Sequence, residues 1–173
     1  MNAGPETGTE NETGAEIETA GRKQGMPEAP VATAVTQISA PIEDVWRVLV
    51  AFDLYAQWHP VLSLDAKPER AVVGAKVPAR VSRAGAEEQE VVLTIVTVQA
   101  PDRLAWEGGS SDTLLGRHLF VLTSRPDGTT ELTDSEEFSG PAAADLVPEL
   151  GRLTQDAARY GAALKTRVEG LSG

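Results

Sequence analysis

VATAVTQISAPIEDVWRVLVAFDLYAQWHP, residues 31–60, is the stretch on which the fold of this chain depends. Its first eight residues are rich in β-branched side chains and predict a strand. The Ser-Ala-Pro sequence at residues 39–41, soon followed by two acidic residues, is typical of a helix N-terminus. Four apolar residues then recur at helical spacing and predict one buried helix face: Ile42, Val45, Trp46 and Leu49. A strand followed at once by a helix therefore opens the folded part of the chain.

A second short helix is expected over residues 53–58, because Pro60 disfavours helical geometry in the residue before it. Tyr55 on this helix is expected at the surface, with a phenol offered to a ligand as the alternative. After this helix, apolar residues no longer recur about every 3.6 residues, as in a helix, but at every second residue, as in a strand. This alternation predicts strands over residues 62–66, 76–83, 88–98, 103–108, 115–124 and 129–139. Gly, Pro and Asp mark short turns between them, which imply an antiparallel meander.

Helical spacing returns in residues 141–169. Pro148 is expected to start or kink a helix of about 20 residues, which would be about 30 Å long. The apolar stripe of this helix consists of Leu146, Leu150, Leu153, Ala157, Leu164 and Val168. One apolar helix stripe beside a one-faced antiparallel sheet predicts an α+β fold of two layers.

Residues 1–28 differ in composition from the rest of the chain, with no aromatic residue and many Glu, Gly and Thr. Such a segment buries too little apolar area to offset its ordering entropy. We therefore expect a disordered acidic tail, followed by one folded domain over residues 29–173. The tail is interpreted as solubilising, with a partner-binding arm as the alternative.

The composition of the chain excludes several classes of function. Its 173 residues carry a net charge of −11, which argues against binding to nucleic acid or docking on an anionic membrane, since both need a basic surface. No apolar run approaches the roughly 18 residues that suggest a spanning helix, and no signal-peptide pattern opens the chain, so we expect a cytoplasmic protein. Arginine outnumbers lysine, which hints at a bacterial source.

Metal and cofactor chemistry is not expected either. The chain has no cysteine and two histidines, which leaves few ligands for a metal site. No phosphate-binding loop or dinucleotide fingerprint is present, so we expect no organic cofactor. An acidic surface without cysteine gives no sign of an obligate assembly, which favours a monomer.

Three local motifs follow one another along these elements. The first is ISAPIEDVWRVLVAFDLYAQWHP at residues 38–60, and the second is LAWEG at residues 104–108. The third is GRHLF at residues 116–120, followed by GTT at residues 128–130 and EEFSG at residues 136–140. In this order the chain resembles the SRPBCC superfamily, which has the START-like or helix-grip fold. Within it, the chain resembles the polyketide cyclase/dehydrase and lipid transport group.

The resemblance implies a curved antiparallel sheet of six to seven strands that grips the C-terminal helix, with an elongated cavity between them. In many relatives this cavity holds an apolar or aromatic small molecule. We therefore expect a small hydrophobic ligand that is polyketide-like, lipid-like or aromatic. Because one fold hosts many functions, two alternatives stay open. One is a polyketide cyclase or aromatase that acts by substrate orientation and proton transfer, and the other is a protein-interaction domain with a collapsed cavity.

The last predicted hairpin brings two candidate catalytic residues together. A Pro-Asp-Gly loop at residues 126–128 sets a register in which His118 lies opposite Glu136. By alternation both share a face with Phe120 and Asp134. We expect His118 and Glu136 to lie side by side on the cavity wall and to share a proton, as an acid–base pair acting on a carbonyl or enol would. The alternative is a polar pair that only fixes the hairpin.

Further residues are candidates for the cavity wall. Trp106 is expected to point inward, whereas Arg117 alternates onto the outer face. Trp58 is interpreted as a core residue, with ligand stacking as the alternative, and His59 as facing either solvent or the mouth of the cavity. The complete set of expected ligand contacts is Trp58, His59, Trp106, His118, Phe120, Asp134, Glu136, Phe138, Leu150, Leu153 and Ala157.

Overall fold

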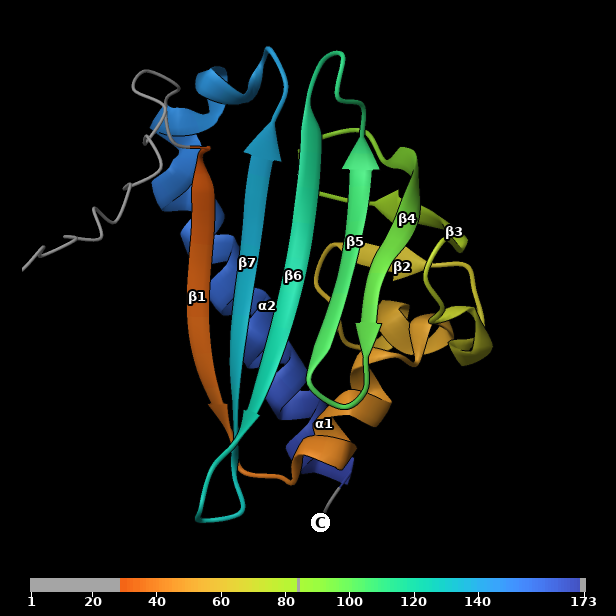
Figure 1. Cartoon of the computed structure of the whole chain (residues 1–173), viewed down its shortest axis with the longest axis vertical. Helices are drawn as coiled ribbons and strands as arrows, with labels where there is room; N and C mark the ends of the chain where they lie inside the picture. Colours follow the sequence, from red (N-terminus) through yellow and green to blue (C-terminus); the bar gives the residue numbers. More distant parts are fainter. Residues whose placement is uncertain (1–28, 84, 172–173) are drawn as a thin grey trace, which may run out of the picture.

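The computed structural model describes residues 29–83 and 85–171, which form one antiparallel sheet and two α-helices (Figure 1). The strands are β1 (Val31–Ile38), β2 (Leu62–Leu64), β3 (Lys76–Val81), β4 (Gln89–Gln99), β5 (Arg103–Gly109), β6 (Leu115–Ser124) and β7 (Thr130–Ser139). The helices are α1 (Ile42–Leu49) and α2 (Leu150–Leu171), with the 3-10 turns η1 (Phe52–Gln57), η2 (Pro68–Arg70) and η3 (Ala143–Glu149). The expected tail, residues 1–28, lies outside the described residues. No helix in the described ranges is long and apolar enough to span a bilayer.

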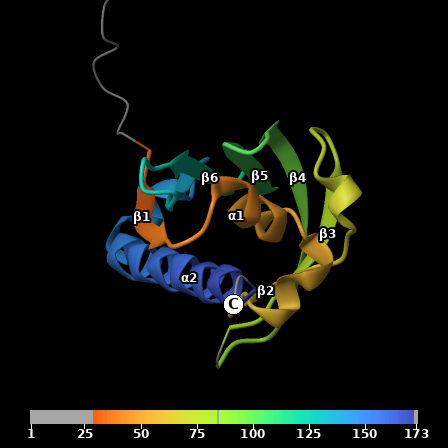
Figure 2. The ribbon, with the colours of Figure 1, turned by 90° about the horizontal axis from the view of Figure 1, so that it is seen from below.

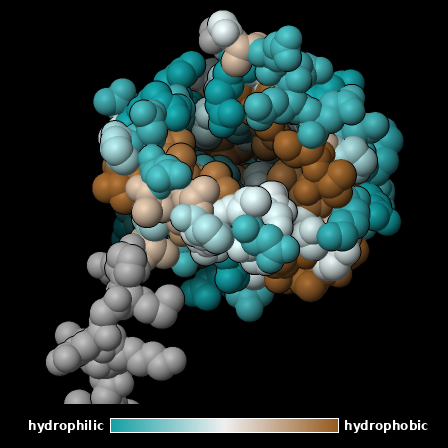
Figure 3. All heavy atoms as spheres, turned by 90° about the horizontal axis from the view of Figure 1, so that it is seen from above, coloured by the Kyte–Doolittle hydropathy of each residue, from teal (hydrophilic) through white to brown (hydrophobic). Residues whose placement is uncertain are grey.

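The sheet has the strand order β1-β7-β6-β5-β4-β3-β2, and every neighbouring pair is antiparallel. Strands β2 to β7 form the predicted meander, and β1 joins it by pairing with β7. Seen from below, the sheet curls around α2, and α1 lies at this lower end (Figure 2). Seen from above, the opposite end is hollowed between hydrophobic side chains (Figure 3). The predicted helix-grip α+β fold is confirmed.

The β6–β7 hairpin has the register predicted from its turn. Gly128 takes a φ of 82° there, a conformation that would strain a residue with a Cβ. His118 then lies opposite Glu136. The neighbouring pair of strands places Trp106 opposite His118. Strands β5, β6 and β7 therefore bring these three side chains onto the same inner face of the sheet.

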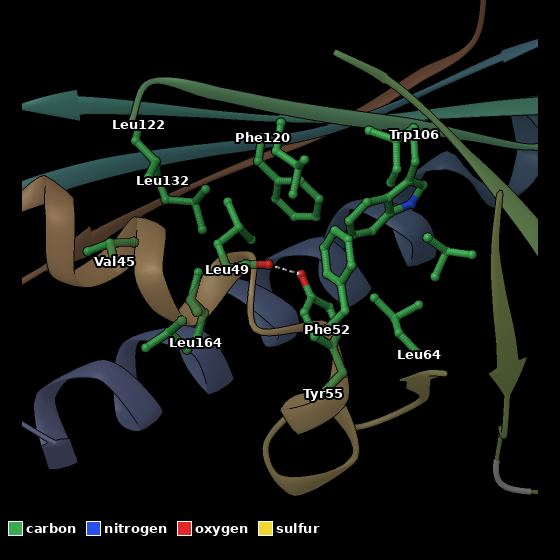
Figure 4. Packing of buried hydrophobic residues seen from close by; sticks show 14 of the residues in the cluster. Val45, Leu49, Phe52, Tyr55, Leu64, Trp106, Phe120, Leu122, Leu132 and Leu164 are labelled. Atoms are coloured by element: carbon green, nitrogen blue, oxygen red, sulfur yellow. Dashed lines mark hydrogen bonds between the residues drawn. The ribbon is translucent and has the colours of Figure 1, made fainter. Parts of the chain in front are cut away.

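The core packs α1 and η1 against the sheet and α2 (Figure 4). Tyr55 belongs to this core and is 1% exposed, so its expected surface position is wrong. Its hydroxyl donates a hydrogen bond of 2.7 Å to the carbonyl oxygen of Leu49, which gives the buried phenol a partner. Burial, reinforced by the charge of Asp134, raises the pKa of Tyr55 well above its usual range. The phenol is therefore a neutral structural group.

Helix α2 packs tightly on β1 at a glycine. A Cβ added to Gly161 would lie 2.3 Å from Thr36 Oγ1 and 3.1 Å from Thr36 Cβ. The buried residues of the helix are Ala157, Gly161, Leu164 and Val168. Leu146, Leu150 and Leu153 of the predicted stripe are only half-buried. Pro148 lies inside η3, so α2 begins after it, and Leu153 lines a cavity. The packed face of α2 is therefore shorter than its sequence pattern predicts.

Candidate functional site

A cavity of about 120 Å³ lies between the inner face of the sheet and α2. Its walls come from the segment after η1, from the six strands β2 to β7 and from the first half of α2. The lining residues are His59, Val61, Leu62, Val81, Arg83, Leu93, Trp106, His118, Glu136, Leu153, Asp156, Ala157 and Tyr160. Both apolar and titratable side chains line it, so the cavity suits a molecule that is apolar but carries polar groups.

A second hollow of about 250 Å³ adjoins the cavity along β5 and β6. It is lined by Val91, Leu93, Trp106, Gly108, Gly109, Leu114, Gly116, His118, Glu136 and Phe138. The two spaces share Leu93, Trp106, His118 and Glu136. His118 and Glu136 therefore stand where both spaces meet.

His118 on β6 is held in place by Asp134 on β7. Its Nε2 is hydrogen-bonded to Asp134 Oδ1, and the two side chains are 13% and 2% exposed. The imidazole stacks on Phe120, with ring centroids 4.4 Å apart and planes inclined by 16°. Burial alone would lower the pKa of His118, but the charge of Asp134, their hydrogen bond and the charge of Glu136 outweigh burial and raise it above 6.5. The protonated ring is thereby favoured.

The second ring nitrogen of His118 is accessible. Within the described residues, Nδ1 forms no hydrogen bond. It is not among the fully buried side-chain atoms that lack a partner there, which are Trp58 Nε1 and Asp134 Oδ2. Nδ1 is thus not sealed inside the protein and can meet a ligand. The hydrogen-bond partner of His118 is Asp134 rather than the expected Glu136, because the ring turns toward the diagonal neighbour across the hairpin. Glu136 stays on the cavity wall.

His59 forms another part of the wall. Its Nδ1 accepts hydrogen bonds from the backbone N–H groups of Leu62 at 3.0 Å and Val61 at 3.3 Å, so the neutral ring carries its proton on Nε2. The ring packs against Tyr160, with centroids 4.5 Å apart. Burial, reinforced by the charge of His118, lowers the pKa of His59 to about 3. The pKa values of the two histidines of the cavity are therefore shifted in opposite directions.

The low pKa of His59 predicts that acid destabilises the fold. Below pH 6.5 the unfolded chain binds a proton that the folded protein excludes until the pH falls to about 3. The titration of His59 alone should lower the free energy of unfolding by roughly 2 kcal/mol between pH 6.5 and 4.5. Urea unfolding at several pH values measures this slope.

His59→Asn is the matched control for this prediction. An asparagine oxygen can accept hydrogen bonds from the same backbone N–H groups, but it does not titrate. The slope between pH 4.5 and 6.5 should therefore be smaller in the variant by the contribution of His59. An equal slope in the variant and the wild type would assign the acid sensitivity to other groups.

The structure gathers most of the predicted ligand contacts. Those that line one or both spaces are His59, Trp106, His118, Glu136, Phe138, Leu153 and Ala157. Phe120 stacks on the His118 ring, and Asp134 is buried and hydrogen-bonded to that ring. Leu150 sits at the start of α2, outside both linings. Trp58 packs against the hydrophobic core, as interpreted from the sequence, and lines a separate groove beside the end of α2.

Sequence reasoning missed Arg83, Asp156 and Tyr160, which all line the cavity. Tyr160 follows the buried Ala157 by three positions on α2, a spacing that places both on neighbouring parts of one helix surface. That signal was present in the sequence. Arg83 gave no such signal, because it follows the end of β3, where alternation no longer applies. Within the described part of the chain, Arg83 forms no ion pair.

Comparison with known families supports the fold and extends over nearly all of the described chain. Residues 29–169 match the family described as polyketide cyclase/dehydrase and lipid transport. The described ranges hold no group of three or more metal-ligating side chains. No curated protein matches the chain.

Several solved structures share the fold. The chain is 16% identical to a START superfamily protein from Mycobacterium smegmatis, with a TM-score of 0.62 over 82% of this chain and 98% of that one. It is 20% identical to MLL2253 from Mesorhizobium loti, with a TM-score of 0.63 over 83% and 98%. It is also 20% identical to DynU16, from the dynemicin biosynthetic locus, with a TM-score of 0.62 over 83% of this chain and 48% of DynU16. These likenesses show a START-like fold, and the match over residues 29–169 shows that the chain belongs to the polyketide cyclase/dehydrase and lipid transport family.

Proposed function

We propose that this protein binds a small, largely apolar molecule with a carbonyl or phenolic oxygen in the cavity between the sheet and α2. Its family and fold suggest hydrophobic ligand binding or a polyketide cyclase-like function. The observation that carries the proposal is the geometry of His118. Asp134 fixes its ring, and Nδ1 stays accessible on the wall that the two spaces share.

The surroundings of His118 suit such a ligand. Leu93 and Trp106 offer apolar contact on one side, while Glu136 offers an acceptor for a hydroxyl group. Ligand sites commonly combine an apolar lining with a few placed polar groups. A hydrogen bond from a charged donor contributes about 1.5–3 kcal/mol, so a ligand oxygen at Nδ1 would dominate orientation.

A second candidate function is acid–base catalysis on the bound molecule. It is favoured by the register of β6 and β7, which sets Glu136 directly opposite His118. Opposed residues in an antiparallel pair have Cβ atoms about 5 Å apart, so their side chains can reach neighbouring atoms of one ligand. His118 would donate a proton to a carbonyl oxygen while Glu136 takes a proton from the adjacent carbon. The product is an enol, the reactive form that cyclisation needs.

Thermal unfolding of the full chain with candidate ligands tests the binding proposal. The classes are fatty acids, sterols, quinones, flavonoids and aromatic polyketides. A ligand at about 100 times its Kd stabilises the folded state by about 2.7 kcal/mol, which raises Tm by several degrees. We expect a concentration-dependent rise for oxygen-bearing aromatic compounds. Conversion of such a compound with turnover would establish the second candidate.

His118→Asn and Arg117→Ala form the matched pair of variants. Each is compared with its own ligand-free Tm, because removal of His118 leaves Asp134 without a partner. The loss of a charged hydrogen bond should weaken binding by roughly tenfold or more in His118→Asn. Arg117 is exposed on the outer face, so its variant should bind normally. A flat response from every class would contradict the proposal and favour a protein-interaction domain.

A further inference from the structure

The groove beside the end of α2, called the α2-end groove from here on, is a space apart from the cavity at His118. Its volume of about 460 Å³ falls within the roughly 300–1,000 Å³ of small-molecule pockets. The end of α2 lies beside the chain terminus marked in Figure 2, whereas the hollow of Figure 3 lies at the opposite end of the molecule. The groove is lined by Gln57, Trp58, Ala163, Thr166, Arg167, Gly170 and Leu171, and it shares none of them with the two spaces at His118.

Two side chains of this groove carry hydrogen-bond donors that lack an acceptor. Arg167 is half-buried and forms no ion pair among the described residues, and its Nη2 donates a hydrogen bond of 3.0 Å to Gln57 Oε1. Trp58 Nε1 is fully buried and has no hydrogen-bond partner in the same part of the chain. A guanidinium and an indole N–H can donate but not accept. Because buried donors almost always have a partner, the missing acceptor indicates a molecule from outside the described chain.

The charge of the groove indicates that this acceptor is an anion. The whole chain has 26 acidic and 15 basic side chains, yet the lining of the groove holds one arginine and no acidic residue. The planar guanidinium of arginine matches a carboxylate, to which it can donate two parallel hydrogen bonds. The single charge of a carboxylate would balance Arg167, whereas a phosphate dianion would leave one charge without a partner.

The remaining walls of the groove suit an alkyl chain. Leu171 is 62% exposed, so an apolar molecule that covers it would remove apolar surface from water. Ala163 and Gly170 carry little or no side chain, and a Cβ at Gly170 would have nothing within 4 Å. The space beside Leu171 is therefore open and can take a short, flexible chain.

We propose that the α2-end groove is a second binding site, which takes a short aliphatic carboxylate. The carboxylate pairs with Arg167 and accepts a hydrogen bond from Trp58 Nε1, and the alkyl chain lies over Leu171. The site goes beyond the proposed function, because it uses neither His118 nor the cavity around it. Each of the two sites can therefore fail without the other.

Titration of the full chain with hexanoate, followed by NMR at the indole N–H signals, tests the site. Trp58 lines the groove and Trp106 lines the cavity, so their signals report on the two places, and Trp58→Phe assigns the first signal by its loss. We expect a saturable downfield shift of the Trp58 signal. Hexanol has the same chain without the charge, and it should bind at least roughly tenfold more weakly. A Trp58 signal that does not move, or that responds equally to both compounds, would overturn the site.

Arg167→Gln and Arg117→Gln are the matched pair of variants, because each removes one positive charge and Arg117 is exposed on the outer face of the sheet. Arg167→Gln should weaken hexanoate binding by roughly tenfold or more, and Arg117→Gln should leave it unchanged. Ala163→Leu fills the groove with a residue that favours helix, so it should abolish the Trp58 shift while the fold persists. Wild-type affinity in both Arg167→Gln and Ala163→Leu would contradict the site. A shift confined to Trp106 would also contradict it, and would leave the proposed function standing.

Discussion

Replacement of Asp134 by alanine is expected to destabilise the protein by about 3–5 kcal/mol, as loss of one partner of a buried ion pair does. Asp134 is 2% exposed and its Oδ1 holds His118 Nε2 across the hairpin. Without the carboxylate, the imidazole remains desolvated but has lost its partner. Urea unfolding at pH 7 measures the effect. Glu137→Ala changes an exposed residue of the same strand and should shift stability by less than about 0.5 kcal/mol.

Asp134→Asn separates the charge of this residue from its shape. Burial, which lowers the pKa of His118, is then no longer outweighed by the charge of Asp134, so the pKa should fall. In the wild type the raised pKa means that the pair stabilises the fold fully below pH 6.5, and that this contribution is lost as the pH rises through the folded-state pKa. The stability difference between the two proteins should therefore shrink at alkaline pH. An NMR titration that finds the same His118 pKa in both would refute the pairing.

Gly161→Ala is expected to lower the free energy of unfolding by about 1–3 kcal/mol through overpacking. By helix propensity alone, alanine would stabilise a helix by about 1 kcal/mol relative to glycine. A loss of stability would therefore indicate overpacking. The added Cβ would lie 2.3 Å from Thr36 Oγ1, so α2 must move away from β1. Because α2 forms one wall of the cavity, the same shift should alter ligand affinity.

Two further variants isolate the contact at Gly161. Gly151→Ala lies on the same helix with nothing within 4 Å, and it should be neutral or stabilising by up to about 1 kcal/mol. Thr36→Ala removes the closest atom and leaves a Cβ at 3.1 Å, so the double variant should recover part of the loss. If Gly161→Ala proves as stable as Gly151→Ala, the close packing of α2 on β1 is contradicted.

The sequence predicted those features that depend on the alternation of side chains along a strand and on the residues of a turn. The turn at Gly128 sets the register of β6 and β7, and alternation then places His118, Asp134 and Glu136 on one face. The sequence could not show which of the two carboxylates His118 contacts. Glu136 is its direct neighbour and Asp134 its diagonal one, and sheet twist together with side-chain rotamers decides between them.

The remaining errors concern segments in which apolar residues show no clear helical or strand spacing. Tyr55 lies in η1, a 3-10 turn of six residues, which is too short to show which face is buried. Arg83 and Tyr160 reach the cavity from a strand end and from a helix far along the chain. Their meeting depends on how tightly the sheet curls, which is a property of the assembled core.

The pairing of β1 with β7 also bears on how the protein is made. The buried hydrogen bond from the Thr130 hydroxyl to the carbonyl oxygen of Ala40 joins residues 90 positions apart. Contacts between such distant segments slow folding, because a long loop must close before they form. During synthesis β1 leaves the ribosome first, and its backbone edge has no native partner until β7 follows. The first strand of the sheet is therefore the segment that spends longest exposed to non-native pairing and to chaperones.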